Sequence, residues 1–497
     1  MHWNVLSMLW NLDLEKILHA LSYQPRAPLL FNSGFFLWFF TAFLVVYALV
    51  FNRSMLRTLW VVAASLYFYY KSSGMYWILM LGTSALVFLL GLWMERTEGA
   101  RRKKLVMGLG IVWSLAFLIY FKYGAFFLKT WDSLTGTHTA LPDLFLPLGI
   151  SFYTFELIAY LVDIHRGKSP ALRNPLDFAF YVSFFPHLVA GPIVRPAELI
   201  PQIRKPHPIT GAATGLGVWL LGTGLIKKAI LSDYLSLNYV DRIFDNPTLY
   251  SGLENLMGVY GYTLQIYCDF SGYTDMALGI ALLMGYQLPQ NFNRPYQATN
   301  LTDFWRRWHI SLSSWLRDYL YIPLGGNRGG RLRQHLNQLI TMLLGGLWHG
   351  ADWKFVWWGA LHGLGLGADK EWRKLNLLPE GKWRNLLGGI VTFHFVAFCW
   401  IFFRAGSLSD AWKVIDGIAY RTQWNLAKPL LLAYPMVWMA LAFGFLAHLS
   451  PQRWTKAAER IWSNAPFLFQ TAWLLVVVMA VVQVKSAAVQ PFIYFQF

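Results

Sequence analysis

Charged residues are scarce in this sequence of 497 residues. Asp, Glu, Lys and Arg together make up 13% of it, whereas soluble globular domains contain roughly a quarter. Cysteine is scarcer still, since the chain has two, and Cys268 and Cys399 lie far apart in apolar surroundings. This pattern excludes a disulfide framework and a thiolate metal site, and no other metal site is predicted. The low charge excludes an ordinary soluble enzyme.

The sequence also lacks the short motifs of several enzyme classes. It contains no HExxH, no GxxxxGK[ST] and no GxSxG, the signatures of zinc peptidases, P-loop proteins and α/β-hydrolases. The formal net charge of +17 does not indicate nucleic-acid binding, because the basic residues lie in short loops and no soluble domain remains to carry a basic face. Basic loops are instead typical of the cytoplasmic side of a bacterial inner-membrane protein.

Apolar residues are abundant, at 56% of the chain, and aromatic residues reach 18%. They gather in blocks that approach the roughly 20 residues a helix needs to cross a bilayer. The blocks do not alternate polar and apolar residues as the strands of a membrane barrel do. We therefore predict an all-α polytopic membrane protein of about 11 helices, surrounded by membrane lipids. The apolar blocks lie near 35–51, 56–71, 75–94, 105–121, 147–162, 176–193, 212–231, 256–285, 337–366, 386–403, 430–448 and 467–484.

Two regions are expected along the chain. Residues 1–30 are predicted to be an amphipathic interfacial segment and not a signal peptide, since a basic start and a cleavage site are missing. Residues 31–497 show no repeat and no long linker, so we expect one membrane domain. Its blocks are interrupted by polar, Gly and Pro residues between about 145 and 366. Irregular backbone at membrane depth is tolerated where it lines a cavity, so this core is expected to carry the chemistry.

The block at 337–366 contains a histidine, His349, in the run LWHGAD. The segments before and after it, 303–334 and 369–374, are both net basic. If both face the cytoplasm, the block enters and leaves on the same side. We predict two half-helices that meet near His349, which then lies at the tip of a re-entrant hairpin.

His349 is the predicted general base. A neutral imidazole can take a proton from an attacking hydroxyl. Gly345, Gly346 and Gly350 leave room for a ligand beside it, and Trp348 supplies an apolar wall. A structural alternative stays open on the residues alone, in which His349 bonds a backbone carbonyl and pins two helices together.

The densest polar run is at 300–330, and it is predicted to begin as a helix capped by Asn300. Trp305 and Trp308 start an apolar stripe on this helix, and His309 is a second catalytic candidate next to the stripe. The glycine-rich turn that follows offers backbone N–H groups for a phosphate, although a simple cytoplasmic turn explains it equally well. The candidate donor- or substrate-binding residues here and in the hairpin are Trp305, Arg306, Arg307, Arg317, Asp318, Asn327, Arg328 and Trp348.

Polar residues also interrupt the block at 256–285. Asp269, Ser271, Tyr273 and Asp275 are predicted to face a cavity or to pair with arginine, because a carboxylate is costly inside a membrane. A buried structural ion pair and direct substrate contact both stay open. The expected partners are Arg306, Arg307 and Arg317.

Five segments, in this order, resemble the membrane-bound O-acyltransferase family (MBOAT), and specifically its bacterial alginate O-acetyltransferase branch. They cover the chain from about 145 to 365 and are highly specific. The segments are PLGISFYTFELIAYLVDIHRG, FFPHLVAGPIVR, YCDFSGYTDMALG, FWRRWHISLSSWLRDYLYIPLGGNR and TMLLGGLWHGADWKFVWWGALHG.

The resemblance implies a fold and an activity. The fold is a ring of tilted helices, with re-entrant and interfacial helices, around a funnel and tunnel. His349 matches the catalytic histidine of the LWHG segment, and His309 matches the second signature polar residue. The implied donor is cytoplasmic acetyl-CoA, with no permanently bound cofactor. The acyl group then crosses the membrane to a hydroxyl acceptor, and a partner acetyltransferase of the SGNH type completes O-acetylation of an exopolysaccharide or cell-wall polysaccharide.

On this basis His349 deprotonates the acceptor, and His309 orients the donor or polarises its carbonyl through a hydrogen bond. Arginines near the cytoplasmic mouth would bind the donor's phosphates. D-alanyl, lipid or protein O-acyl transfer within the same family is an alternative. A transporter with a polar path through broken helices is an alternative of another class.

Overall fold

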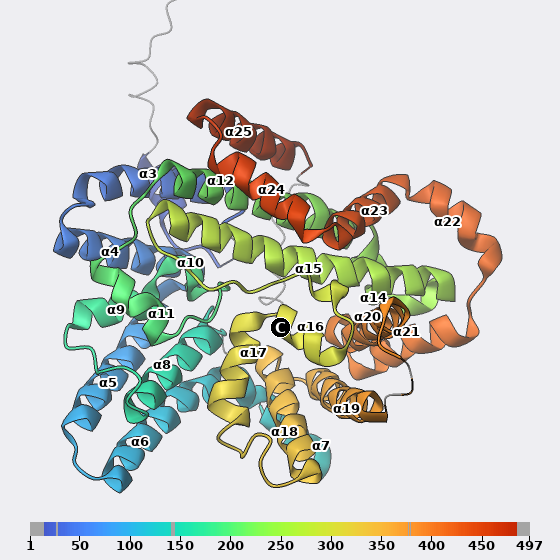
Figure 1. The fold of residues 1–497 in the computed structure, drawn as a ribbon, viewed down its shortest axis with the longest axis horizontal. Coiled ribbons are helices and arrows are strands. Elements are labelled where there is room, and N and C mark those ends of the chain that lie inside the picture. Colours follow the sequence, from blue (N-terminus) through green and yellow to red (C-terminus); the bar gives the residue numbers. More distant parts are fainter. Residues whose placement is uncertain (1–13, 26–27, 141–144, 376, 378, 485–497) are drawn as a thin grey trace, which may run out of the picture. The chain divides into compact units, whose positions relative to one another are not determined.

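The computed structural model describes residues 14–25, 28–140, 145–375, 377 and 379–484. Every regular element among these residues is a helix, which confirms the all-α prediction (Figure 1). The chain divides into two compact units, and each is described by itself. The prediction of a single membrane domain from 31 to 497 stays a prediction.

The first unit comprises residues 1–117, 144–189 and 203–205. Its core contains an aromatic cluster in which Phe36, Phe43 and Phe68 surround Phe185, with ring centroids 5.5–6.5 Å from that of Phe185. Its helices are α2 (Leu14–Leu21), α3 (Gly34–Val50), α4 (Ser54–Ser73), η1 (Gly74–Tyr76), α5 (Trp77–Arg96), α6 (Ala100–Leu118, except its last residue), α8 (Ile150–His165), α9 (Pro175–Ser183) and α10 (Phe185–Leu188). The first 13 residues of the predicted interfacial segment lie outside the described residues.

The second unit comprises residues 118–143, 190–202 and 206–497. Its helices, apart from two residues at the end of α11, are η2 (Ile119–Tyr123), α7 (Gly124–Thr135), α11 (Pro196–Arg204), α12 (Gly211–Leu225), η3 (Ile226–Ser232), α13 (Asp233–Leu235), η4 (Ser236–Val240), α14 (Asp241–Asp245), η5 (Pro247–Leu249), α15 (Gly252–Leu283), η6 (Pro295–Gln297), α16 (Leu301–Arg307), α17 (Ile310–Leu316), η7 (Arg317–Tyr321), α18 (Arg331–His349), α19 (Trp353–Leu375), α20 (Lys382–Arg404), α21 (Leu408–Tyr420), η8 (Trp424–Leu426), α22 (Ala427–Ala433), α23 (Pro435–Leu449), α24 (Gln452–Ser463) and α25 (Phe467–Val484).

Several helices are long and apolar enough to cross a bilayer. Five of those in the described part of the chain meet both criteria, and a sixth span results if the bent segment from Trp424 to Leu449 is counted as one. The chain is therefore a multi-pass membrane protein. The predicted number of about 11 spans stays a prediction, because the other helices are shorter or more polar.

The long helix α15 packs along α12 through glycines in the second unit (Figure 1). A Cβ atom on Gly224 would lie 2.6 Å from the carbonyl oxygen of Gly272, and one on Gly279 would lie 2.6 Å from that of Gly217. Small residues let two helix backbones approach closely in membrane proteins. The glycines at these positions therefore fix the α12–α15 pair.

The helices α18 and α19 form an antiparallel hairpin. α18 ends at His349 and α19 begins at Trp353. A Cβ on Gly346 would lie 2.2 Å from the carbonyl oxygen of Phe355, and one on Gly359 would lie 2.3 Å from that of Met342. The predicted hairpin with His349 at its tip is therefore confirmed as geometry, while its re-entrant placement in a membrane stays a prediction.

The helix expected from Asn300 onward is broken. Asn300 caps α16 as predicted, since its side chain accepts a hydrogen bond from Asp303 N at 2.8 Å. α16 ends at Arg307, and α17 begins at Ile310. His309 stands at the break with φ 43° and ψ 55°, in the left-handed region. The continuous apolar stripe predicted through this segment is therefore wrong, because tertiary contacts outweigh the helical periodicity there.

Candidate active site

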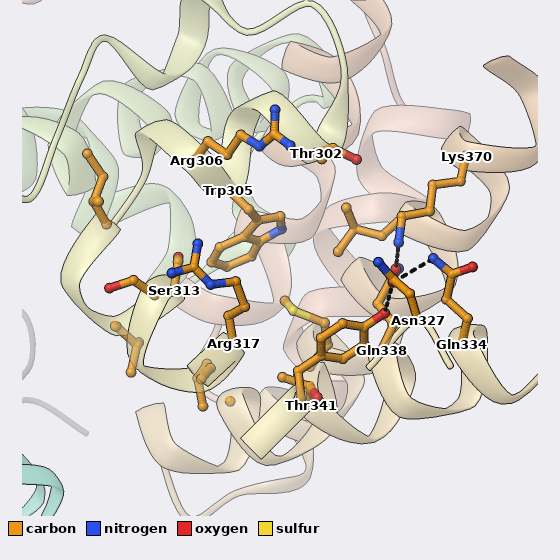
Figure 2. Close-up of a pocket in the computed structure, with 18 of the residues that line it drawn as sticks. Thr302, Trp305, Arg306, Ser313, Arg317, Asn327, Gln334, Gln338, Thr341 and Lys370 are labelled. Carbon is orange, nitrogen blue, oxygen red and sulfur yellow. Dashed lines mark hydrogen bonds between the residues drawn. The ribbon is translucent and has the colours of Figure 1, made fainter. Parts of the chain in front are cut away.

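A cavity of about 520 Å³ lies within the second unit. Figure 2 shows side chains from the polar run and from the hairpin converging on it. The lining residues are Thr302, Trp305, Arg306, Ile310, Leu312, Ser313, Ser314, Leu316, Arg317, Tyr321, Asn327, Gln334, Gln338, Thr341, Met342, Gly345, His349, Trp358, Leu366 and Lys370. The cavity therefore joins the two segments that sequence reasoning selected independently.

His349 forms part of the buried wall of this cavity, and 4% of its surface is exposed. Aromatic rings surround the imidazole edge-to-face, with the centroid of Trp348 at 5.1 Å, that of Trp358 at 5.0 Å and that of Phe403 at 5.2 Å. Such walls restrict the orientation of the imidazole and exclude water. A base in this place meets its substrate in an apolar surrounding.

The end of α18 that carries His349 is capped by the helical turn η2. Lys122 Nζ donates to the carbonyl oxygen of Trp348 at 2.5 Å and to that of His349 at 3.3 Å. The Tyr123 hydroxyl donates to the carbonyl oxygen of Leu347 at 2.9 Å. The last carbonyls of a helix have no partner within the helix and favour a cation nearby. Lys122 supplies the cation, and Lys122 and Tyr123 together supply hydrogen-bond donors to these carbonyls. The two side chains thereby hold the backbone of His349 in place.

Positive charge gathers at the exposed side of the cavity. Arg306 and Arg317 are exposed lining residues, and Lys370 is half-buried. Lys370 Nζ donates to Gln338 Oε1 at 2.5 Å (Figure 2). Burial lowers the pKa of Lys370 below its ordinary value, and the nearby cations Arg373 and Lys374 lower it further. This side of the cavity is suited to an anionic group.

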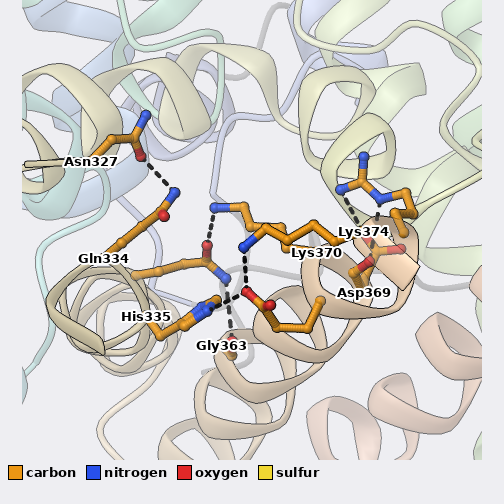
Figure 3. A network of polar contacts seen from close by, with 10 residues as sticks. Asn327, Gln334, His335, Gly363, Asp369, Lys370 and Lys374 are labelled. Atoms are coloured by element: carbon orange, nitrogen blue, oxygen red, sulfur yellow. Dashed lines mark hydrogen bonds and ion pairs between the residues drawn. The ribbon is translucent and has the colours of Figure 1, made fainter. Parts of the chain in front are cut away.

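A network of polar contacts joins the ends of α18 and α19 distant from His349 (Figure 3). Gln338 Nε2 donates to the carbonyl oxygen of Gly363 at 3.3 Å. The side chain of Glu371 lies 2.9 Å from His335 Nε2 and 2.6 Å from Lys374 Nζ. The hairpin is therefore fixed at both of its ends.

His309 is fully buried and does not line the cavity. Its Nδ1 lies 3.1 Å from Asn291 Oδ1, and its ring contacts that of Phe270 edge-to-face at 4.6 Å. The Trp348 ring lies 6.0 Å from His309 and 5.1 Å from His349. The Trp348 ring therefore contacts both candidate histidines, and Trp348 itself does not line the cavity.

The carboxylates of α15 pair with lysines from η3. Asp275 accepts from Lys227 Nζ at 2.6 Å, and Asp269 accepts from Lys228 Nζ at 2.5 Å. The arginine partners expected for them are therefore wrong. Lys227 and Lys228 follow each other directly on a helix that packs against α15, and this proximity selects them over the arginines of the polar run. Both carboxylates, with the neighbouring Ser271 and Tyr273, lie outside the cavity lining.

The remaining candidates divide between the cavity and the surface. Arg307 is paired with Asp303 at 2.9 Å. Asp318 accepts from Arg317 and from Arg195, each at 2.7 Å. Trp305 lines the cavity. Of the candidate arginines, Arg306 and Arg317 thus face the cavity, and the binding roles of all these residues stay predictions.

The glycine-rich turn uses three of its backbone N–H groups for its own hydrogen bonds. The N–H groups of Gly325, Gly326 and Arg328 donate to backbone carbonyls within the turn. Asn327 lines the cavity, and its Oδ1 accepts from Tyr321 Oη at 2.6 Å. Arg328 is exposed and does not line the cavity. The turn is therefore held in part by its own hydrogen bonds, and the expected phosphate cradle stays a prediction.

Another buried histidine lies in the first unit. His187 Nδ1 lies 3.0 Å from Glu156 Oε1, and both side chains are buried. His187 lies on α10 and Glu156 on α8, so this pair joins the two helices.

Sequence reasoning missed Lys122, Asn291, Gln338 and Lys370. Lys122 stands just past a long apolar block, and a lone lysine at the edge of such a block was a usable signal. Asn291 lies in a loop without periodicity, and its importance arises from a contact 18 residues along the chain. No feature of the sequence alone distinguishes Gln338 or Lys370 from other polar residues of their helices.

Comparisons with known proteins show which family the chain is related to. The model of the family described as MBOAT, membrane-bound O-acyltransferase family, matches residues 171–380. "Probable alginate O-acetylase AlgI" of Pseudomonas aeruginosa is 39% identical over 412 residues, which cover 80% of this chain and 76% of that protein.

Relatives with two other names also match. "Peptidoglycan O-acetyltransferase" of Helicobacter pylori is 37% identical, over 78% of this chain and 80% of that protein. "Teichoic acid D-alanyltransferase" of Bacillus subtilis is 28% identical, over 55% of this chain and 73% of that protein. The chain therefore belongs to the membrane-bound O-acyltransferase family and is an acyltransferase.

Proposed function

We propose that this enzyme transfers an acetyl group from a cytoplasmic thioester donor, acetyl-CoA, to a hydroxyl of a cell-envelope polysaccharide or of a protein that serves it. The observation that carries the proposal is the cavity with His349 in its buried wall and cationic side chains at its exposed side. A donor with a thioester and phosphate groups matches this arrangement, with the thioester near His349 and the phosphates near the cationic side chains. The relatives named for O-acetylation favour acetyl over D-alanyl as the acyl group.

The chemistry is acyl transfer with His349 as general base. The imidazole takes the proton of the acceptor hydroxyl while the oxygen attacks the thioester carbonyl carbon. The tetrahedral intermediate collapses, the C–S bond breaks, and the thiolate leaves. The proton then passes from the imidazolium of His349 to the thiolate, which restores the neutral base and releases a free thiol.

The donor is proposed to bind with its anionic part at Arg306, Arg317 and Lys370. Arg guanidinium groups bind phosphate through paired hydrogen bonds, whereas Lys supplies a point charge. The carboxamides of Gln334 and Gln338, also in the lining, suit the amide groups of a donor's arm. This order places the thioester toward His349.

The cellular setting is part of the proposal. The basic loops favour the bacterial inner membrane, with the donor side toward the cytoplasm. An SGNH-type acetyltransferase on the outer side is proposed to receive the acetyl group and pass it to the polysaccharide. Acetylation of the polysaccharide by the purified enzyme alone would contradict this second step and leave the first intact.

Purified enzyme in liposomes with radiolabelled acetyl-CoA tests the proposal. Wild type should release CoA thiol and attach label covalently to the added partner acetyltransferase, and to an alginate or peptidoglycan fragment only when that partner is present. His349→Ala should lower kcat by about 10³-fold, the scale of general base catalysis. His138→Ala removes an exposed histidine outside the cavity and should behave as wild type.

Two outcomes would defeat the proposal. Wild-type kcat in His349→Ala would remove the base from the mechanism. Label that enters the liposomes without covalent attachment to any acceptor would indicate transport.

A further inference from the structure

His309 has a backbone conformation that its sequence does not favour. It links α16 to α17 with φ 43°, and residues with a Cβ atom seldom occupy the left-handed region. It is one of two non-glycine residues with positive φ in the described part of the chain. A conformation of this kind persists where surrounding contacts hold it.

Asn291 supplies those contacts. Its Oδ1 lies 2.9 Å from Ser311 Oγ, 3.2 Å from Ser311 N and 3.1 Å from His309 Nδ1. Its backbone carbonyl accepts from Ile310 N at 2.9 Å. The asparagine is fully buried, so these contacts are shielded from water. Asn291 therefore binds His309 at the break and the first two residues of α17.

The hydrogen-bond network identifies which atom of the amide faces the break. The oxygen and nitrogen of an asparagine side chain have the same shape, and their assignment follows from their partners. The backbone N–H of Ser311 can only donate, so the atom next to it must be an oxygen. An amide oxygen can only accept. The Nδ1 atom of His309, which contacts the same oxygen, must therefore carry a hydrogen.

We infer that Asn291 is a positioning residue that fixes the tautomer of His309, with the hydrogen on Nδ1 and the lone pair on Nε2. Neutral imidazole carries one N–H, and in His309 this N–H donates a hydrogen bond to Asn291 Oδ1. The consequence for catalysis rests on the proposed function. With its one hydrogen bonded to Asn291, a neutral His309 has no N–H left to donate to the thioester oxygen, and it lies fully buried outside the cavity lining. Of the two roles expected for His309, this inference rules out polarisation of the carbonyl, and orientation of the acyl donor stays a prediction.

Nuclear magnetic resonance of enzyme labelled with ¹⁵N at histidine tests the tautomer without reference to activity. Two-bond proton–nitrogen correlations distinguish the two tautomers, and His309→Gln assigns the signal. Wild type should show His309 with hydrogen on Nδ1. Asn291→Leu, which removes the acceptor at similar volume, should release this preference. Hydrogen on Nε2 of His309 in the wild type would overturn the inference.

Kinetics supply the second readout. Asn291→Leu should lower kcat by at least about 30-fold, because His309 loses its fixed tautomer, and Asn291→Asp should restore most of it because a carboxyl oxygen accepts from the same donors. Asn255→Leu is the matched control. Asn255 is an equally buried asparagine that donates to the carbonyls of Pro247, Tyr250 and Ser251, so its loss destabilises the unit without touching His309.

The outcomes separate the inference from the proposed function. Equal losses of kcat in Asn291→Leu and Asn255→Leu would reduce Asn291 to a structural residue and overturn the inference. A wild-type enzyme that shows the hydrogen on Nδ1 of His309 but releases no thiol from acetyl-CoA would defeat the proposed function and leave the inference intact.

Discussion

The α18–α19 hairpin and the broken helix α16–α17 each carry one of the two candidate histidines, and they hold it by different means. The hairpin relies on backbone proximity, since Gly346 and Gly359 let the two helices touch. His349 follows as the last residue of α18 and borders the cavity. The broken helix relies on one buried amide, and Asn291 gathers His309 and its neighbours around a single oxygen.

This difference shows how the contacts that hold each histidine decide whether its side chain reaches the cavity. A side chain at a helix end faces the space beyond the helix, so His349 reaches the cavity. His309 lies at a break that its own loop encloses, so its side chain is fully buried and does not line the cavity. The residue that meets the substrate is thus held by helix packing, and the residue behind it is held by hydrogen bonds.

Removing the backbone proximity of the hairpin should have the largest effect. Gly346→Ala places a Cβ atom 2.2 Å from the Phe355 carbonyl oxygen, a backbone atom that cannot move aside alone. Overpacking typically costs about 1–3 kcal/mol, and a backbone clash lies at the upper end of this range, so acetyl transfer should fall about 100-fold. Thermal unfolding in detergent and thiol release measure the two effects.

Gly389→Ala is the matched control for that change. Its Cβ would meet its nearest neighbour, the Ala298 carbonyl oxygen, at 3.7 Å. Alanine in a helix is favoured over glycine by about 1 kcal/mol, so this variant should be as stable as wild type or more stable. Equal stability of the two alanine variants would show that proximity does not hold the hairpin.

Removing the cap at the hairpin tip should have an intermediate effect. Lys122→Met deletes the ammonium that bonds the Trp348 and His349 carbonyls. The His349 backbone loses its support, and a cation at a helix C-terminus contributes about 0.3–2 kcal/mol. We expect kcat to fall about 10-fold at unchanged KM for acetyl-CoA.

Lys122→Arg should recover much of that loss because it restores a cationic donor. Lys129→Met removes an exposed lysine from the adjoining helix α7 and should have no effect. A change of KM alone in Lys122→Met would assign this lysine to donor binding.

The smallest effect is expected beside the broken helix. Burial by itself raises the pKa of Asp318, but hydrogen bonds from Arg317 and Arg195 outweigh it and hold the pKa below its ordinary value. A lowered pKa means that the ionised form stabilises the fold above the unfolded pKa of about 3.9 and that this contribution is lost as pH falls through the folded pKa. Asp318→Asn should cost about 1 kcal/mol at neutral pH.

Thermal unfolding from pH 7 to pH 3 measures this contribution. The difference between wild type and Asp318→Asn should stay constant down to about pH 5 and shrink below about pH 4. A difference that does not change with pH would contradict the ion pair as its cause.

Hydropathy predicted much of the fold because its signal is local. The apolar blocks became helices such as α3 and α20, and the charges on both sides of the hairpin indicated its turn at His349. The break at His309 was not predictable in this way. Neither Trp308 nor His309 is a helix breaker, and the apolar stripe continues through them. The break is set by Asn291, which is close in space and 18 residues away in sequence.

The sequence predicted which types of residue the site region contains, but it did not predict which of them pair. A carboxylate inside an apolar block requires a cation, and the sequence offered arginines and lysines in several loops. Hydropathy does not rank these candidates. Asp269 is paired with Lys228 because η3 packs along α15, a contact that involves 41 residues of separation. Residue type therefore followed from chemistry, and the partner followed from packing.

The turn that carries Lys122 is a π-helix of five residues, Ile119–Tyr123, inserted between α6 and α7. A π-helical turn contains one residue more than an α-helical turn. It therefore decides in which direction the side chains of the following helix, α7, point. A gene that loses one codon here encodes a chain of nearly the same hydropathy and composition, yet the side chains of α7 are rotated by about 100° around their helix axis. In evolutionary terms we expect the length of this stretch to be constrained more than its residue types, so single-codon deletions within it should be selected against more strongly than most apolar substitutions.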